Sequence, residues 1–264
     1  MLIIGEKINS SIPSTANAIK ARDEGFLTKL ALDQMEAGAQ MIDVNAGTFV
    51  DEEIDLLKWL IGLVQSVADI PLCIDSPNPV ALAEAMPLSR KKSLVNSISL
   101  EAERYSGVVS VVKEHKASVV ALCMDDKGIP KDAAGRIEIA CRLADKLNSD
   151  GIANEDIYFD VLVQPISVDA SFGMACLEAV IGIRNKIPGA HTTCGLSNIS
   201  FGLPERKLLN STYLTALMTA GMDTFIIDPL DKRMMATILA SQAVLGQDEY
   251  CAEYLSGFRA GKLK

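Results

Sequence analysis

Short apolar runs alternate with stretches of helical periodicity along the whole chain, and this alternation limits the fold more than any other feature. Each run is apolar at consecutive positions, as in parallel strands that are buried on both faces. The eight runs are Leu2–Gly5, Met41–Val44, Pro71–Ile74, Ser93–Val95, Ala117–Met124, Ile157–Val161, His191–Cys194 and Thr224–Ile227. Eight β-then-α units in 264 residues predict a (β/α)8 TIM barrel of the α/β class, because a doubly wound sheet usually has fewer strands.

The segments between the runs show helical spacing and ordinary helix end signals. Thr48 is a plausible N-cap for the helix after the second run, and Pro204 and Gly221 mark the two ends of another helix. No Gly/Ser/Pro-rich linker or charge run divides residues 1–264, so we expect one domain. An extra helix is expected near residues 248–258, either capping the bottom of the barrel or joining a second copy of the chain. Its apolar side carries Tyr250, Tyr254, Leu255 and Phe258.

The charge and the cysteines exclude several partners and locations. A formal net charge of −9 argues against nucleic acid and against an anionic membrane surface, since both need basic clusters. The six cysteines form no C-x-x-C pair, which indicates buried thiols in a reduced, cytoplasmic protein. The chain turns polar after four residues, so no secretory signal is expected. No apolar run approaches the roughly 18 residues of a membrane span.

Polar side chains follow every one of the eight runs. They are Glu6 and Asn9, Asp43 and Asn45, Asp75, Asn96 and Ser97, Asp125 and Asp126, Asp160, Ser197 and Asn198 after Gly195, and Asp228. A single Asp after a strand is more often a helix N-cap than a catalytic residue. In a TIM barrel, however, the carboxyl ends of all strands meet at one mouth, where activity is found. The set therefore predicts a polar site at the mouth.

The residue types of this set limit what it could bind. The chain has no G-x-x-x-x-G-K-[ST] phosphate loop, no G-x-G-x-x-G and no G-x-S-x-G nucleophile motif. It also has no compact His/Asp ligand motif, so we expect no bound metal. Asp and Asn side chains suit a neutral heterocycle with amidine-like N–H donors and a lactam C=O, as in a pterin. His191 lies inside an apolar run and is expected to be a packed core residue.

Six motifs, in register across almost the whole chain, resemble the pterin-binding barrel family. They are Gly5-Glu6-Lys7-Ile8-Asn9, Asp43-Val44-Asn45-Ala46-Gly47, Asp75-Ser76, Asn96-Ser97, Gly128-Ile129-Pro130-Lys131-Asp132 and Gly195-Leu196-Ser197-Asn198. Within that family the chain most resembles the methyltetrahydrofolate:corrinoid protein methyltransferases. The folate domains of cobalamin-dependent methionine synthases and the dihydropteroate synthases resemble it more distantly.

The resemblance implies roles for particular residues. Asp75, Asn96 and Asp160 would hold the pterin ring, Glu6 and Gly195 would form the pocket wall with Ser197 beside them, and Arg206 would lie near the aminobenzoyl-glutamate tail. Asn198 would be the catalytic residue, a mobile asparagine that hydrogen-bonds N5 as the methyl group moves. One position departs from the family pattern, since Phe201 stands where acetogenic members carry Gln.

The same resemblance implies the reaction and the partners. A methyl group would pass between N5 of tetrahydrofolate, as 5-methyltetrahydrofolate, and the cobalt of a cobalamin carried by a separate corrinoid protein. Such chemistry belongs to anaerobic one-carbon metabolism or O-demethylation, in a direction that the sequence leaves open. The proton for N5 would come from solvent or from a water held by Asp75 and Asn96. A homodimer is expected.

Three alternatives remain at this point. A dihydropteroate synthase would need cations for a diphosphate, yet the second and eighth runs are followed by Thr48–Asp51 and Asp228–Asp231, which are acidic or apolar. A non-catalytic folate-binding subunit would have little use for Asn198. A barrel that metabolises sugars or acids would not bind folate at all.

Overall fold

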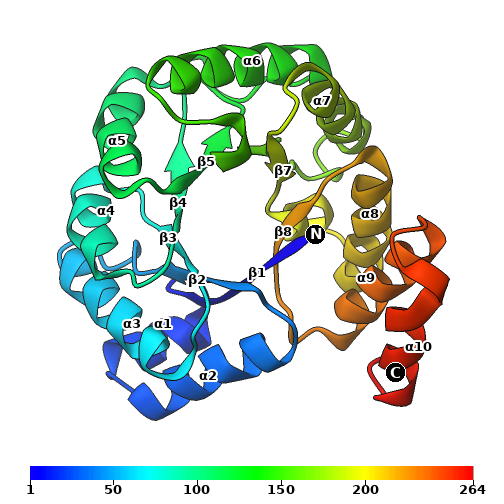
Figure 1. The fold of residues 1–264 in the computed structure, drawn as a ribbon, viewed down its shortest axis with the longest axis horizontal. Coiled ribbons are helices and arrows are strands. Elements are labelled where there is room, and N and C mark those ends of the chain that lie inside the picture. The colour runs from blue at the N-terminus through cyan, green and yellow to red at the C-terminus, as the bar shows by residue number, and fades with distance from the viewer. Residues whose placement is uncertain (264) are drawn as a thin grey trace.

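A computed structural model describes residues 1–263, in which eight parallel strands form a ring surrounded by helices (Figure 1). The strands are β1 (Leu2–Asn9), β2 (Met41–Asn45), β3 (Leu72–Asp75), β4 (Leu94–Ile98), β5 (Ser118–Leu122), β6 (Ile157–Asp160), β7 (His191–Thr193) and β8 (Thr224–Ile227). The helices are α1 (Pro13–Lys20), α2 (Glu24–Glu36), α3 (Glu53–Val67), α4 (Pro79–Ala85), α5 (Ala102–His115), α6 (Ala133–Ser149), α7 (Phe172–Lys186), α8 (Arg206–Ala220), α9 (Lys232–Val244) and α10 (Ala252–Arg259). Short 3-10 helices are η1 (Met86–Leu88), η2 (Asn154–Asp156), η3 (Leu196–Ser200) and η4 (Glu249–Cys251).

The strand ladder runs once around the ring. Neighbours pair in parallel in the order β7-β6-β5-β4-β3-β2-β1-β8, so β1 has β2 on one side and β8 on the other. A further parallel bridge between Gly195 and Ile226 spans the remaining interval from β7 to β8. The predicted (β/α)8 TIM barrel is confirmed.

Two apolar clusters hold the barrel together, one between strands and helices and one inside the ring. The inner cluster consists of Ile4, Met41, Cys73, Leu94 and Val120, with Leu2, Leu122, Tyr158 and Ile226 packed against it. Because side chains two positions apart on a strand face the same way, the next inward side chains are polar. They are Glu6 after Ile4, Asp43 after Met41, Asp75 after Cys73, Asn96 after Leu94 and Asp160 after Tyr158. The barrel therefore has an apolar floor with a polar layer directly above it.

Two strand ends differ from the expected bounds, with consequences for the polar set. β1 continues to Asn9, so Glu6 and Asn9 lie within the strand rather than after it. β5 ends at Leu122, and Asp125 lies beyond it in a turn where its Oδ1 accepts from the backbone N–H of Lys127 at 3.0 Å. Asp125 is thus a turn residue, as is common for Asp outside strands.

One predicted helix start is wrong and another helix has the expected ends. The residue that precedes α3 is Glu52, and Thr48 instead joins the β1–α1 loop, donating from Oγ1 to the carbonyl of Ser10 at 3.3 Å. α8 begins two residues after Pro204 and ends at Gly221, whose φ of 101° is a left-handed conformation that suits glycine.

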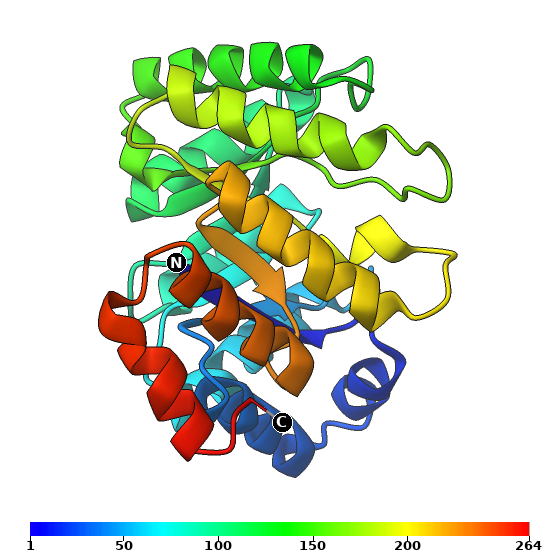
Figure 2. The ribbon, with the colours of Figure 1, turned by 90° about the vertical axis from the view of Figure 1, so that its right-hand side faces the viewer.

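The C-terminal helix α10 lies on the outside of the ring. It runs beside α9 rather than across the bottom of the barrel (Figures 1 and 2), so the expected cap is wrong. The approach of the two helices is close, because a Cβ added at Gly257 would lie 2.8 Å from Cδ1 of Leu239. Leu255 and Phe258 remain exposed on α10.

Candidate active site at the carboxyl end of the barrel

The predicted contact residues share one location, the carboxyl end of the barrel. Glu6 is in β1, Asp75 ends β3, Asn96 is in β4, Asp160 ends β6, Gly195 follows β7, Ser197 and Asn198 lie in η3, and Arg206 begins α8. In Figure 2 the arrow of β8 points towards the side on which η3 and α1 lie, away from α10 and the N-terminus. Asp75 and Asn96 are opposite each other in the strand ladder. The four strand residues are each partly exposed, as side chains that open on a mouth would be.

A chain of side-chain hydrogen bonds links β1, β2 and β3 across this layer. The Ser10 hydroxyl donates to Oδ1 of Asn45 at 2.8 Å, and Nδ2 of Asn45 donates to Oδ2 of Asp75 at 2.9 Å. Nδ2 of Asn9 points to Oδ2 of Asp43 at 3.4 Å. Asn9, Asp43 and Asn45 were expected among the polar strand ends but not among the contact residues, so this part of the site was missed.

Asp43 lies below the mouth and is almost fully enclosed. Its exposed fraction is 1%, and among residues 1–263 its Oδ1 has no hydrogen-bond partner. Burial and the neighbouring Asp75 carboxylate raise the pKa of Asp43 well above its usual range, against a lowering contribution from Asn9. A buried carboxyl beside a second one favours its neutral form.

Three further carboxyls have pKa values that approach neutrality. Burial, with Asp228 nearby, raises the pKa of Glu6 to about 7, although Lys7 opposes the change. Burial raises the pKa of Asp75 to about 6 while the hydrogen bond from Asn45 lowers it. Such shifts occur where acids and bases work near neutral pH.

Asp160 shows the same behaviour on the other side of the barrel. Burial raises the pKa of Asp160 to about 6, against lowering contributions from the backbone N–H of Leu162 and from Arg136. Its Oδ1 accepts from that N–H at 2.7 Å. Both Asp75 and Asp160 are therefore mostly ionised at pH 7 and able to accept hydrogen bonds.

Asn198 lies exposed on η3 at the rim. A Cβ placed on Gly195 would be 3.4 Å from Nδ2 of Asn198, so the amide lies over this glycine. Among residues 1–263 the amide has no side-chain hydrogen bond, so its N–H groups are available to a ligand. Arg206 supports the same turn, because its Nη2 donates to the Ser197 carbonyl at 2.7 Å and its Nε to the Ser200 hydroxyl at 3.0 Å.

Exposed apolar side chains surround the mouth. Val50, Val168 and Phe201, in the loops after β2, β6 and η3, have exposed fractions of 78%, 74% and 62%. All three loops follow strands at their carboxyl ends, so these side chains belong to the end of the barrel that carries the candidate site.

His191 does not belong to this site. It is the first residue of β7, at the amino end of the barrel, and its Nδ1 is 2.9 Å from Oδ2 of Asp223. Its ring stacks on Tyr158 with the centroids 4.6 Å apart, yet 34% of the side chain is exposed. His191 is therefore half-buried at the amino end of the barrel, and the expectation of a packed core residue is wrong.

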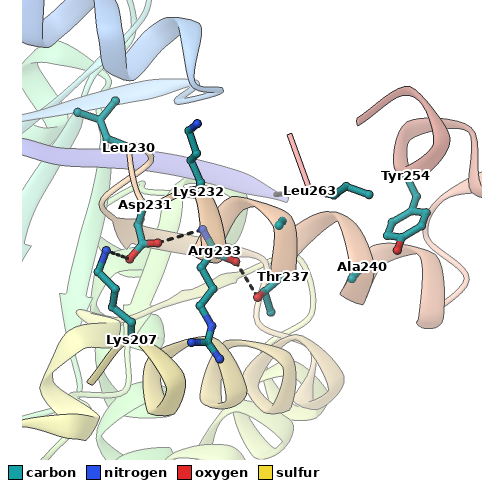
Figure 3. A pocket seen from close by; sticks show the side chains of 10 residues that line it. Lys207, Leu230, Asp231, Lys232, Arg233, Thr237, Ala240, Tyr254 and Leu263 are labelled. Atoms are coloured by element: carbon teal, nitrogen blue, oxygen red, sulfur yellow. Dashed lines mark hydrogen bonds and ion pairs between the residues drawn. The ribbon is translucent and has the colours of Figure 1, made fainter. Parts of the chain in front are cut away.

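A cavity of 710 Å³ lies outside the barrel, between α9, α10 and the start of α8 (Figure 3). Its lining includes none of the predicted contact residues. Nζ of Lys207 pairs with Oδ2 of Asp231 at 3.1 Å, and Oδ1 of Asp231 caps α9 by accepting from the backbone N–H of Arg233 at 3.0 Å. These polar groups satisfy one another, as helix-end residues commonly do.

Residues 1–263 lack two kinds of feature. None of the helices in this region combines the length and the hydrophobicity that a membrane span needs. No group of three or more His, Cys, Asp or Glu side chains in it could hold a metal ion.

Comparisons with known proteins identify the family of the chain. The family model described as "Pterin binding enzyme" matches residues 8–228. A methylcorrinoid:tetrahydrofolate methyltransferase of Eubacterium limosum is 38% identical over 100% of this chain and 98% of its own length. A methionine synthase of Mycobacterium tuberculosis is 29% identical over 86% of this chain, which spans only 20% of that protein.

Solved structures similar to this chain include dihydropteroate synthases. The enzyme of Xanthomonas albilineans, in complex with indole-2-carboxylic acid and 6-chloroguanine, has a TM-score of 0.71 at 17% identity, covering 94% of this chain and 93% of its own. The enzyme of Yersinia pestis, in a sulfonamide complex, has a TM-score of 0.72 at 13% identity, covering 93% and 94%. Identity this low establishes the shared barrel alone. Because the family model matches most of its length, the chain belongs to the pterin binding enzyme family.

Proposed function

We propose that this protein transfers a methyl group between N5 of tetrahydrofolate and the cobalt of a corrinoid carried by a second protein. The observation that carries the proposal is the whole-chain match, at 38% identity, to a methylcorrinoid:tetrahydrofolate methyltransferase. The polar layer at the mouth supplies side chains that suit such a substrate. We further propose that residues 1–264 form a single cytoplasmic domain, and that the exposed side chains of α10 join a second copy in a homodimer.

The pterin would lie on the apolar floor with its polar edge against three side chains. Asp75 and Asp160, ionised at pH 7, accept hydrogen bonds from the amidine-like N–H groups. Asn96, opposite Asp75, can both accept from a ring N–H and donate to the ring carbonyl. Charged acceptors form strong hydrogen bonds, which offset the cost of enclosing them.

The reaction requires a group that follows the change at N5. In 5-methyltetrahydrofolate N5 is a tertiary amine. It is a good leaving group in methyl transfer only if it gains a proton or a strong hydrogen bond. The exposed amide of Asn198 can donate to N5 and is not committed elsewhere. An interaction that strengthens in the transition state raises kcat rather than substrate affinity. Glu6, with a pKa of about 7, stands in the same layer as a group that can exchange a proton with solvent.

The second substrate reaches N5 through the open mouth. When bound, the corrinoid supplies or accepts the methyl group at its cobalt. The rim side chains Val50, Val168 and Phe201 fit a large apolar macrocycle and the protein that holds it. The name of the Eubacterium limosum relative gives methylcorrinoid as donor and tetrahydrofolate as acceptor, and we propose the same direction here. In that direction the reaction runs in reverse: N5 of tetrahydrofolate would take up the methyl group and would release to solvent the proton that it gains in methyl transfer from 5-methyltetrahydrofolate.

Dihydropteroate synthase is the second candidate, because solved structures with this fold carry that activity. It would need a diphosphate site, yet Asp51 follows β2 and Asp228 and Asp231 follow β8. These carboxylates would repel a diphosphate. The acidic residues at these two positions therefore favour methyl transfer over dihydropteroate synthesis.

Turnover with a defined cobalt acceptor tests the proposal. The protein is mixed anaerobically with 5-methyltetrahydrofolate and reduced free cobalamin, and methylcobalamin is followed by absorbance. We expect growth of methylcobalamin that is reduced in Asn198→Ala and unchanged in Asp125→Asn, a control in a surface turn. Tight folate binding without turnover would instead identify a non-catalytic folate-binding subunit, and the absence of both would exclude any folate enzyme.

A further inference from the structure

A fully buried arginine stands behind the carboxylate of Asp160. Arg136 belongs to α6 and has an exposed fraction of 0%. Its hydrogen bonds go to the Pro130 carbonyl (3.0 Å from Nε), the Val161 carbonyl (2.8 Å from Nη1), Sγ of Cys176 (2.7 Å from Nη1) and Oε1 of Gln164 (3.0 Å from Nη2). None of these acceptors is a carboxylate. A guanidinium enclosed in this way carries a large desolvation cost, which its hydrogen bonds offset.

Three of the four acceptors of Arg136 lie in two loops near Asp160, and the fourth, Cys176, lies in α7. Pro130 lies between β5 and α6, whereas Val161 and Gln164 lie between β6 and α7. Val161 is the residue directly after Asp160, and Leu162 follows with a φ of 57°, a left-handed conformation that a leucine seldom adopts. In that conformation the backbone N–H of Leu162 donates to Oδ1 of Asp160 at 2.7 Å. Strained turns persist where the surroundings fix them, and here Arg136 holds the middle residue of the turn.

Arg136 is also the charged group that faces Asp160 from the elements packed around it. Burial raises the pKa of three neighbouring thiols, those of Cys123, Cys176 and Cys194, so all three are neutral near pH 7. The guanidinium lowers the pKa of Asp160, against the effect of burial. With one oxygen of Asp160 held by Leu162, the other remains for a ligand.

We propose that Arg136 is a positioning residue for the pterin: it fixes the turn after Asp160 and supplies the charge that keeps this carboxylate ionised towards the mouth. The inference rests on the proposed function, in which Asp160 accepts hydrogen bonds from the pterin ring. A residue with only a packing role would set stability without affecting how binding responds to pH.

The experiment measures the dissociation constant of tetrahydrofolate by calorimetry over roughly pH 5.5 to 8.5, the range in which perturbed carboxyls titrate. The proteins are the wild type, Arg136→Met, Arg136→Lys, Asp160→Asn and the double variant Arg136→Lys/Asp160→Asn. Arg142→Met serves as the matched control, since Arg142 is on the same helix but pairs with Asp125 at the surface.

Removing the charge should move the pH midpoint of binding upwards. We expect Arg136→Met to bind roughly tenfold more weakly than wild type near pH 6.5, with a smaller difference near pH 8.5, because one pKa unit corresponds to a factor of ten. Arg136→Lys keeps a charge but not the planar fork, so its midpoint should stay near that of wild type while affinity falls at every pH. In the Asp160→Asn background, Arg136→Lys should cause little further loss, as in a coupled pair. Arg142→Met should match wild type.

Two results would overturn the inference, and both differ from a failure of the proposed function. One is a folded Arg136→Met protein whose pH midpoint equals that of wild type. The other result applies even if Arg136→Met does not fold. It is a loss of tetrahydrofolate affinity in the Arg136→Lys/Asp160→Asn double variant that equals the sum of the losses in the two single variants, expressed as free energies. If the wild type bound no tetrahydrofolate, or if Asp160→Asn bound it as tightly as wild type, the proposed function would fail instead.

Discussion

Nδ2 of Asn45 donates a hydrogen bond to Oδ2 of Asp75 at 2.9 Å, joining the end of β2 to the end of β3. Oδ1 of the same amide accepts from the Ser10 hydroxyl and from the backbone N–H of Gly47, so the orientation of Asn45 is fixed from both sides. The amide therefore presents a donor to Asp75 and leaves the other carboxylate oxygen to the mouth. This arrangement prepares Asp75 for a ligand before the ligand arrives.

Replacing Asn45 by Leu should raise the pKa of Asp75, since the hydrogen bond from Asn45 lowers it. Ionised Asp75 would then be lost at a higher pH, and the acidic limb of the pH profile of kcat/KM for 5-methyltetrahydrofolate would shift upwards. We expect a shift of about one unit, near the value of one charge-assisted hydrogen bond. An unshifted acidic limb in a folded variant would show that Asp75 does not need this amide.

Arg104 on α5 should hold the relative positions of Asp75 and Asn96. Its guanidinium donates to the carbonyls of Ser76, Pro77 and Ser97, the residues that follow the two side chains along the chain. In Arg104→Ala we expect KM for the folate to rise roughly tenfold or more, because small misplacements of binding groups are costly. Arg90→Ala is the control, since Arg90 makes a similar bond to the Gln65 carbonyl away from the mouth. Equal effects of the two variants would indicate a general loss of stability.

Asn198→Ala should lower kcat by roughly 10²-fold, as for other preorganised donors, with little change in the dissociation constant of the folate. Gly195→Ala provides an independent test, because the new methyl group would lie 3.4 Å from Nδ2 of Asn198, in contact with the amide, and would restrict its movement. Its kcat should also fall, while Ser200→Ala changes it less. Stopped-flow absorbance of the cobalamin gives kcat, and a large loss of folate affinity in Asn198→Ala would assign the residue to binding instead.

Glu6 should make stability depend on pH in the direction opposite to most carboxylates. Its pKa in the folded protein, about 7, is above its ordinary value of 4.5, so the folded state binds the proton more tightly than the unfolded state. The contribution of Glu6 is therefore favourable below about pH 4.5 and is lost as pH rises towards 7. Glu6→Gln, which mimics the neutral form, should raise the Tm by roughly 2–4 °C at pH 8 and little at pH 5. Calorimetric melting at the two pH values measures the difference, and an equal gain at both would contradict the raised pKa.

Much of the fold could be predicted because a strand that is buried on both faces appears in the sequence as a short apolar run. The run Thr224–Ile227 coincides with β8, and the polar ends of the runs do meet at one end of the barrel. The prediction was less accurate where an end depends on pairing. β1 extends four residues beyond its apolar run because Ile8 and Asn9 pair with Val44 and Asn45 across a register shift. Nothing local to residues 6–9 indicates that shift.

The supporting residues of the site were missed for a similar reason. Asn45 and Asp43 were visible as polar strand ends, but their partners, Asp75 and Asn9, come from neighbouring strands and depend on register. Arg104 and Arg136 lie on helices, where a charged side chain ordinarily faces solvent. Only the folded barrel shows that their guanidinium groups turn inwards to loop carbonyls. The placement of α10 beside α9 likewise depends on the close approach at Gly257.

Because side chains fill the interior beneath the polar layer, the barrel is open only at its mouth. Met41, Leu94 and Val120 fill the barrel below the polar layer, so a folate can enter and leave only through the mouth. In the proposed reaction the corrinoid protein would cover the same mouth in order to reach N5. In that reaction a folate must therefore bind before the carrier docks and can leave only after the carrier departs, although both are bound during methyl transfer.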